Sequence, residues 1–165
     1  MGRDSHHHSD ASTVACAVIT VSDTRTAETD GSGQRIQELL RRSGHRITQY
    51  EILRDEPQLI IAAIGAVPPP TEVVILNGGT GLTRRDATFE AVSRLFEKEI
   101  PGFGELFRLL SYADIGAAAM LSRATAGVVG DRVVFSVPGS PAAVELAMTK
   151  LIVPALGHLV GLVRG

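Results

Sequence analysis

Apolar and polar positions along the chain follow two alternating periodicities, which predict strands that alternate with helices. Residues 15–22 form a nearly continuous apolar run, which is typical of a strand buried on both faces. Residues 73–76 and 133–137 are further apolar runs, and residues 45–53 alternate enough to form another strand. Because helical segments separate most of these runs, we expect an α/β fold of three layers. Its sheet is mainly parallel, with helices on both faces and right-handed crossovers.

The expected helices are recognised from apolar stripes and from residues that start or stop helices. Ile36, Leu39 and Leu40 mark one helix face that ends near Gly44, and a second helix opens at Pro57. Apolar spacing predicts further helices over residues 89–99 and 103–110. Ser140 is a good N-cap for a last helix, which Pro154 is expected to kink or split. Residues 133–137 are expected to pair with the segment around 128–129 across a turn.

The composition narrows the class of protein. The length of 165 residues suits one domain, and 44% apolar residues are enough for a core. A net charge of −2 gives no reason to expect a nucleic-acid partner. Cys16 is the only cysteine, which excludes an internal disulfide framework and a four-cysteine zinc site. No apolar stretch in the sequence reaches the expected length of a membrane span.

The beginning of the chain differs in character from the rest. Residues 1–12 are polar and lack a signal-peptide pattern, so we expect a disordered tail before a single domain at 13–165. His6, His7 and His8 fit a tail or a tag better than a metal site. We expect a cytoplasmic protein that contacts neither membrane nor nucleic acid.

Three turn-rich loops carry the candidate chemistry, because each follows a predicted strand and precedes a helix. They are residues 22–33, 77–86 and 138–141. In a parallel sheet such loops meet at one edge, where helix N-termini and free backbone N–H groups attract anions. The Gly-Gly-Thr-Gly run at 78–81 lets the backbone approach a ligand closely. Glycine-rich loops are also ordinary turns, and neither the P-loop nor the dinucleotide-binding glycine pattern is present.

Two acidic residues stand at the same predicted edge and have two interpretations. Asp86 can simply be the N-cap of the next helix, and Asp55 an acidic residue in front of another. Alternatively, they hold Mg²⁺ or hydrogen-bond the N–H groups of a heterocycle. Ser111 and Ser122 are by default partners of nearby backbone. His45 and His158 are assigned no role.

An ordered set of motifs resembles the MoaB/Mog molybdopterin-binding family, including the G domains of gephyrin and its plant relatives. The resemblance covers about residues 14–160. Its segments are Val-Ser-Asp-Thr-Arg-Thr (21–26), Asp-Gly-Ser-Gly (30–33), Asp-Glu (55–56), Asn-Gly-Gly-Thr-Gly-Leu-Thr-Arg-Arg-Asp-Ala-Thr (77–88), Pro-Gly-Phe-Gly-Glu-Leu-Phe-Arg (101–108), Leu-Ser-Tyr (110–112), Leu-Ser-Arg-Ala (121–124) and Val-Pro-Gly-Ser (137–140). The segments at 102–108 and 110–112 are more similar to the MoaB branch than to the Mog branch.

The resemblance implies a molybdopterin adenylyltransferase of molybdenum cofactor biosynthesis. Active members use Mg²⁺ and ATP to adenylylate molybdopterin, release pyrophosphate, and pass the product to a molybdate-insertion enzyme. The family is trimeric, with a hexamer as a further possibility. The resemblance makes Asp55 and Asp86 the catalytic carboxylates and the candidate ligands of Mg²⁺. The implied substrate-binding residues are Ser22, Asp23, Gly78, Gly79, Thr80, Gly81, Ser111, Ser122, Pro138, Gly139 and Ser140. A non-catalytic molybdopterin carrier and a scaffold are the alternative functions.

Overall fold

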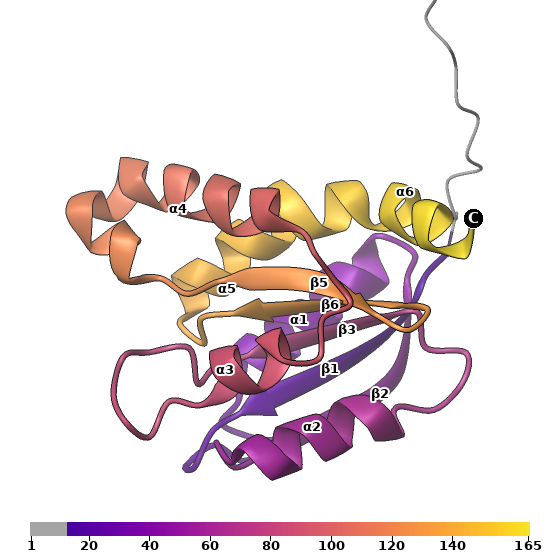
Figure 1. Cartoon of the computed structure of the whole chain (residues 1–165), viewed down its shortest axis with the longest axis horizontal. Coiled ribbons are helices and arrows are strands. Elements are labelled where there is room, and N and C mark those ends of the chain that lie inside the picture. Colours follow the sequence, from indigo (N-terminus) through magenta and orange to yellow (C-terminus); the bar gives the residue numbers. More distant parts are fainter. Residues whose placement is uncertain (1–12) are drawn as a thin grey trace, which may run out of the picture.

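A six-stranded sheet forms the middle layer of the computed structural model, which describes residues 13–165 (Figure 1). The strand order is β2-β1-β3-β6-β5-β4. The strands are β1 (Ala15–Val21), β2 (Arg46–Leu53), β3 (Val73–Asn77), β4 (Lys98–Glu99), β5 (Thr125–Val129) and β6 (Arg132–Val137). The pairs β2-β1, β1-β3 and β3-β6 are parallel, whereas β6-β5 and β5-β4 are antiparallel. The predicted mainly parallel sheet is therefore confirmed, together with the hairpin that joins β5 and β6.

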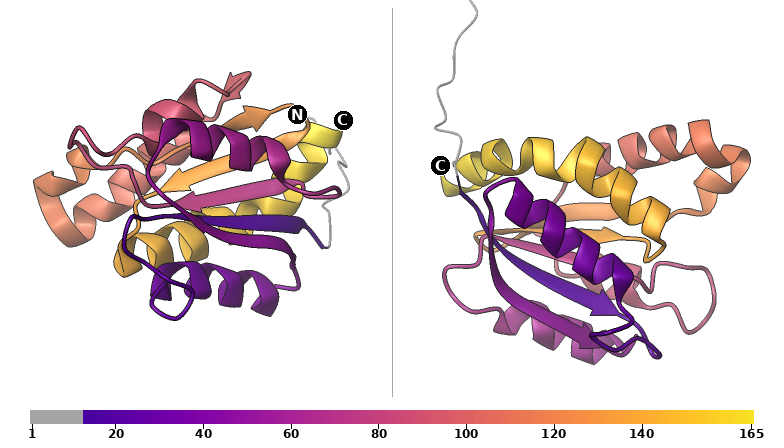
Figure 2. Two further views of the ribbon diagram at one scale, coloured as in Figure 1. Left: turned by 90° about the horizontal axis from the view of Figure 1, so that it is seen from below. Right: turned by 180° about the vertical axis from the view of Figure 1, so that it is seen from behind.

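Helices cover both faces of this sheet, which explains why β1 is apolar at nearly every position. Cys16 and Val18 face a core shared with α1 (Gly31–Arg42), α4 (Pro101–Ile115), α5 (Pro141–Ala147) and α6 (Val153–Arg164). Ala17 and Ile19 face a second core formed with α2 (Pro57–Ala66) and α3 (Thr88–Ser93). Figure 2 shows α1 beside the C-terminal helices, with α2 on the other side of the sheet. Alternate side chains of one strand thus fill two separate cores.

The helix predicted over residues 89–99 is shorter in the structure. Helix α3 ends at Ser93, and Lys98–Glu99 instead form β4 beside β5. The backbone N–H of Glu97 donates to Val128 at 2.9 Å, and that of Ile100 donates to Ala126 at 2.8 Å. Pairing with the sheet therefore overrides the local helical periodicity, which the apolar pattern alone could not reveal.

The C-terminal helix is interrupted near Pro154, as expected. Between α5 and α6, a π-helical turn spans Met148–Ile152 and ends two residues before Pro154. Pro154 has no N–H to donate into an α-helical ladder, so the widened turn is the observed form of the expected disruption. The helical stretch Pro141–Arg164 nevertheless runs for 24 residues and contains an 18-residue segment with a mean hydropathy of 1.7, long and apolar enough to cross a membrane by length and composition. The expectation of no such stretch is therefore wrong, although Val144, Ile152 and Leu156 of this stretch are fully buried core residues.

The predicted tail, residues 1–12 with His6, His7 and His8, lies outside the described residues.

Candidate functional site

The three loops identified in the sequence meet at the carboxyl ends of β1, β3 and β6. The backbone N–H of Gly78 donates to the carbonyl of Val137 at 3.0 Å. A Cβ added to Gly78, whose φ is +102°, would collide with the carbonyl oxygen of Val21, and one added to Gly139 would lie 3.1 Å from the Cα of Gly78. Glycine is required at these contacts, because any side chain would push the loops apart. The expected convergence of the loops is confirmed.

A cavity of about 520 Å³ opens between the glycine loop, α4, α5 and the short 3₁₀ helix η1 (Gly116–Leu121). This main cavity has a volume typical of small-molecule sites. Ten of the predicted site residues line it: Gly78, Gly79, Thr80, Gly81, Asp86, Ser111, Ser122, Pro138, Gly139 and Ser140. Sequence reasoning missed other lining residues, among them Phe107, Asp114 and Leu121. Asp114 could have been found, because it lies three residues after Ser111 and hence on the same helix face.

The Ser122 hydroxyl at this cavity is buried and has no hydrogen-bond partner among the described residues. The default expectation of a bond to nearby backbone is therefore wrong for Ser122. Ser140, in contrast, caps α5 as expected, because its Oγ accepts a hydrogen bond from the backbone N–H of Ala143 at 3.3 Å.

A second, smaller hollow of about 330 Å³ adjoins the main cavity, since Gly78 and Gly139 line both. Ser22 lies here, where its Oγ accepts hydrogen bonds from the backbone N–H groups of Thr24 and Arg25 at 3.2 and 3.1 Å. The structure therefore separates Ser22 from the serines of the main cavity but keeps it at the same sheet edge.

A buried carboxylate at the smaller hollow joins several elements of the fold. Asp30 caps α1 by accepting a hydrogen bond from the backbone N–H of Gly33 at 2.9 Å. Its other oxygen accepts hydrogen bonds from the hydroxyls of Thr20 and Tyr50, both at 2.6 Å. The Thr20 hydroxyl in turn accepts a hydrogen bond from the amide of Asn77 at 2.9 Å. This network joins β1, β2, β3 and α1 directly behind the glycine loop.

Asp55 is buried against one side of the glycine loop. Its Oδ1 accepts hydrogen bonds from the backbone N–H of Ala87 at 3.1 Å and from the Thr88 hydroxyl at 3.4 Å. A Cβ on Gly79 would lie 2.5 Å from Oδ2 of Asp55. Burial is the main cause that raises the pKa of Asp55, and the negative charge of Asp86 adds to the effect. The charge of Asp86 therefore disfavours ionisation of Asp55.

Asp86 lies against the other side of the same loop. Its Oδ2 accepts hydrogen bonds from the hydroxyl and the backbone N–H of Thr83, at 2.5 and 2.9 Å. The bond from the Thr83 hydroxyl is the largest cause that lowers the pKa of Asp86, and the backbone of Gly81 and the charge of Arg123 also contribute. The interpretation of Asp86 as a helix N-cap is wrong, because α3 begins after Ala87, and Ala87 bonds to Asp55.

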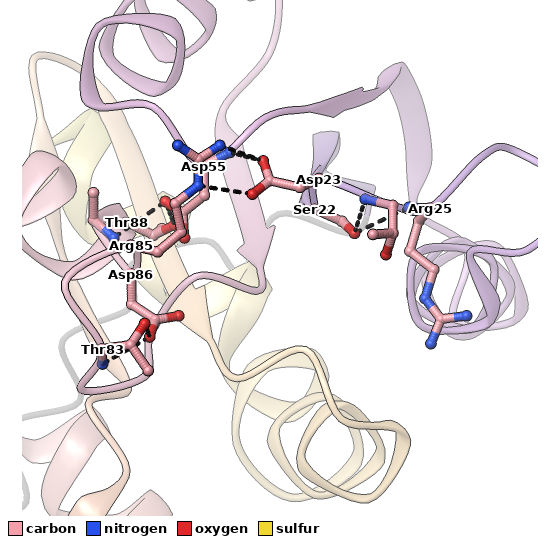
Figure 3. A network of polar contacts seen from close by, with 10 residues as sticks. Ser22, Asp23, Arg25, Asp55, Thr83, Arg85, Asp86 and Thr88 are labelled. Atoms are coloured by element: carbon pink, nitrogen blue, oxygen red, sulfur yellow. Dashed lines mark hydrogen bonds and ion pairs between the residues drawn. The ribbon is translucent and has the colours of Figure 1, made fainter.

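Asp23 belongs to the loop at residues 22–33 and contacts the loop at residues 77–86. It lines neither cavity and forms a two-pronged ion pair with Arg85, with N···O distances of 2.8 and 2.9 Å (Figure 3). Its Oδ1 also accepts a hydrogen bond from the backbone N–H of Asp55 at 3.2 Å. The hydrogen bond from Arg85 is the main cause that lowers the pKa of Asp23. Asp23 thus links the loop at residues 22–33 to the loop at residues 77–86.

Arg123 binds the glycine loop through hydrogen bonds to its backbone carbonyls. The sequence analysis did not single out this residue. Its Nε donates to the carbonyl of Thr80 at 3.0 Å, and a second nitrogen donates to the carbonyl of Gly81. The guanidinium also pairs with Glu90 and lies 5.0 Å from the centre of the Phe89 ring. The Thr80 carbonyl faces Arg123, and the Gly81 N–H of the same peptide faces Asp86. Arg123 therefore fixes the orientation of the peptide that contacts Asp86.

The acidic residues suit a magnesium ion only when a ligand completes its shell. Among residues 13–165, no group of three or more His, Cys, Asp or Glu side chains could enclose a metal by itself. Magnesium in phosphate-handling sites commonly uses one or two carboxylates, with phosphate oxygens and water as the other ligands. Asp86, which lines the main cavity, fits such a site, whereas Asp55 lines neither the main cavity nor the smaller hollow and accepts hydrogen bonds from Ala87 and Thr88.

Comparison with known proteins agrees with this geometry. Residues 17–158 match the family described as "Probable molybdopterin binding domain". The chain is 57% identical over 149 residues to molybdenum cofactor biosynthesis protein B of Bacillus cereus, covering 88% of each chain. It is 54% identical over 154 residues to the protein of that name from Bacillus subtilis, covering 92% of this chain and 91% of the relative.

Solved structures give the same result. A crystal structure of a molybdenum cofactor biosynthesis protein B is similar with a TM-score of 0.89 and 55% identity, covering 92% of this chain and 96% of the other. The tungsten cofactor synthesizing protein MoaB of Pyrococcus furiosus has a TM-score of 0.84 and 38% identity, covering 94% and 99%.

Proposed function

The chain belongs to the family of molybdopterin-binding domains, in its MoaB branch, and from this premise we propose that it transfers AMP from Mg-ATP to molybdopterin. Its relatives place it in molybdenum cofactor biosynthesis. The proposal of AMP transfer is supported by the pair of carboxylates on the two sides of one glycine loop. Asp55 lies against Gly79, and Asp86 lies against Gly81.

The proposed reaction needs two anionic substrates side by side. A phosphate oxygen of molybdopterin attacks the α-phosphorus of ATP, the bond to the β-phosphate oxygen breaks, and pyrophosphate leaves with that electron pair. The main cavity and the smaller hollow share Gly78 and Gly139, which supports adjacent sites for two ligands. Little covalent chemistry is required of the protein, so orientation and charge neutralisation supply most of the rate enhancement.

The residues of the chain have distinct roles in this proposal. Asp86 has a lowered pKa and stays ionised, as a ligand of Mg²⁺ must. Bound Mg²⁺ would neutralise charge on the phosphates. Asp55 is more deeply buried and keeps Gly79 and the start of α3 in register. Neither role requires a catalytic histidine or cysteine, and Cys16 is buried, with its pKa raised to about 12.

Pyrophosphate release tests the proposal directly. The protein is incubated with molybdopterin, Mg²⁺ and ATP, beside an active member of the family as control. We expect release in the wild type and in Asp131→Ala, an exposed position in the β5–β6 turn, but none in Asp86→Asn. Absence of pyrophosphate from the wild type would reject adenylyl transfer. Stoichiometric molybdopterin binding without ATP consumption would then assign the carrier function.

We also propose a cytoplasmic homotrimer that passes its product to a molybdate-insertion enzyme. The support for the trimer is the family resemblance, together with large apolar side chains exposed on α4 and η1, including Leu109, Ile115 and Met120. Sedimentation equilibrium of the full chain should give three times the monomer mass. Six times that mass would indicate the hexamer, and the monomer mass would contradict the proposed assembly.

A further inference from the structure

Asp114 is a carboxylate of the main cavity to which the fold gives no structural task. It lies in the last turn of α4 and lines the main cavity. Its side chain makes no hydrogen bond or ion pair with any residue of the described part of the chain, 13–165. A negative charge near a helix C-terminus is electrostatically unfavourable, so helix stability does not explain it either. In contrast, Asp86 is held by Thr83.

The surroundings of Asp114 differ from those of the glycine loop. Near it, Phe107 and Leu121 add apolar surface, and Ser122 offers a hydroxyl that lacks a partner. The backbone N–H groups of Gly79 and Thr80, which have no partner among the described residues, suit an anion, whereas a phosphate next to Asp114 would be repelled. A ligand with one anionic end should therefore place its other end, a flat group with hydrogen-bond donors, towards Asp114.

A pterin has the edge that fits this carboxylate. Its ring N3–H and its exocyclic 2-amino group are two donors side by side, and a carboxylate can accept from both at once. From these observations we infer that Asp114 recognises the 2-amino-4-oxo edge of the pterin and sets the direction in which the substrate lies. This inference rests on the proposed function, because it assumes that the main cavity takes molybdopterin. Asp114 is thereby a specificity residue for the heterocycle.

The experiment compares two ligands that differ at this edge alone. They are the monophosphates of 6-hydroxymethylpterin and of the matching lumazine, in which a carbonyl replaces the 2-amino group. Each displaces molybdopterin from the full chain in a competition titration at constant pH. The lumazine presents an acceptor to the Asp114 carboxylate, so the wild type should prefer the pterin about tenfold or more, as expected for one hydrogen bond to a charged group.

Asp114→Asn should lose most of this preference, because the amide offers a donor as well as an acceptor. Glu105→Gln is the matched control, an exposed carboxylate of the same helix that does not line the main cavity, and it should keep the preference. Asp114 is exposed, and a thermal unfolding curve checks that its variant folds.

The possible failures are distinct. If the wild type does not bind molybdopterin, the proposed function is wrong and the inference falls with it. If the wild type binds molybdopterin but shows no preference, or if Asp114→Asn keeps the preference, the inference alone is overturned.

Discussion

Replacing Arg123 by methionine removes the side chain that fixes the glycine loop while keeping a long apolar stem in its place. Arg123 donates to the carbonyls of Thr80 and Gly81 and lies over the ring of Phe89. Only 20% of its side chain is exposed, so water replaces these contacts poorly. Methionine can make none of the hydrogen bonds.

The expected loss follows from these contacts. Each hydrogen bond to the loop contributes about 0.5–1.5 kcal/mol net, and the cation–π contact about 0.5–1 kcal/mol. The pair with Glu90, whose side chain is half exposed, adds little. Arg123→Met should therefore lower the free energy of unfolding by about 2–3 kcal/mol, which corresponds to a melting temperature lower by roughly 5–10 °C for a chain of this size.

The functional readout is the acid side of the pH profile for pyrophosphate release. The hydrogen bond from Thr83 is the main cause of the low pKa of Asp86, and the charge of Arg123 adds to it. Without that charge the pKa of Asp86 rises, so activity should be lost at a higher pH than in the wild type as the solution is acidified. A purely structural role for Arg123 would lower stability without moving this limb of the profile.

Arg132→Met is the matched control, because Arg132 also donates to a backbone carbonyl, that of Thr71 at 3.2 Å, and does not line the main cavity. It should cost about 0.5–1.5 kcal/mol and leave the pH profile unchanged. The reasoning is refuted if Arg123→Met costs no more than Arg132→Met and its acid limb coincides with that of the wild type.

Three further substitutions test the site and its support. Asp55→Asn should abolish pyrophosphate release, yet its free energy of unfolding should rise relative to that of the wild type as pH rises. Burial raises the pKa of Asp55 above 3.8, so the folded wild type must hold a buried charge at neutral pH, which the amide does not carry. Urea unfolding at pH 3.5 and 7.5 checks this, and a pH-independent difference contradicts it. Gly79→Ala should lower the free energy of unfolding by at least about 1–2 kcal/mol, because φ there is +65° and the methyl group meets Asp55. The control Gly65→Ala, with open space around it in α2, should raise that free energy by about 0.5–1 kcal/mol in the same assay. Phe107→Ala should cost about 3–5 kcal/mol in thermal or urea unfolding, because its ring is 2% exposed and packs in the core beside Phe103; a loss below about 1 kcal/mol would contradict that packing.

The parts of the fold that could be predicted are those in which local pattern and tertiary environment agree. Residues 15–21 are apolar at every position except Thr20 because both faces of β1 are buried, and that pattern points to a central parallel strand. The convergence of the three loops followed from parallel order alone, since the carboxyl ends of β1, β3 and β6 share an edge. The position of β4 could not be predicted, because its two residues are exposed and are defined only by their pairing with β5.

The individual contacts at the site depended on geometry that the sequence does not contain. Asp86 looked like a helix cap, but Asp55, 31 positions earlier in the chain, binds the start of α3. Asp23 was expected among substrate contacts, and its ion pair with Arg85, 62 positions later in the chain, had no signal in the sequence. Arg123 lay within a recognised motif without a distinguishing signal, because its partners in the glycine loop are backbone carbonyls. Such long-range polar contacts leave no periodic trace in the sequence.

Amide hydrogen exchange with and without molybdopterin tests most directly whether the glycine loop, the α4–η1 segment and the turn before α5 enclose one ligand. At saturating molybdopterin, exchange should slow in peptides covering residues 77–83, 111–122 and 138–143, which border the main cavity. The turn at 129–132, which does not border it, should exchange at the same rate in both samples. Unchanged exchange in 77–83, or protection confined to segments away from the carboxyl ends of β1, β3 and β6, would contradict the account.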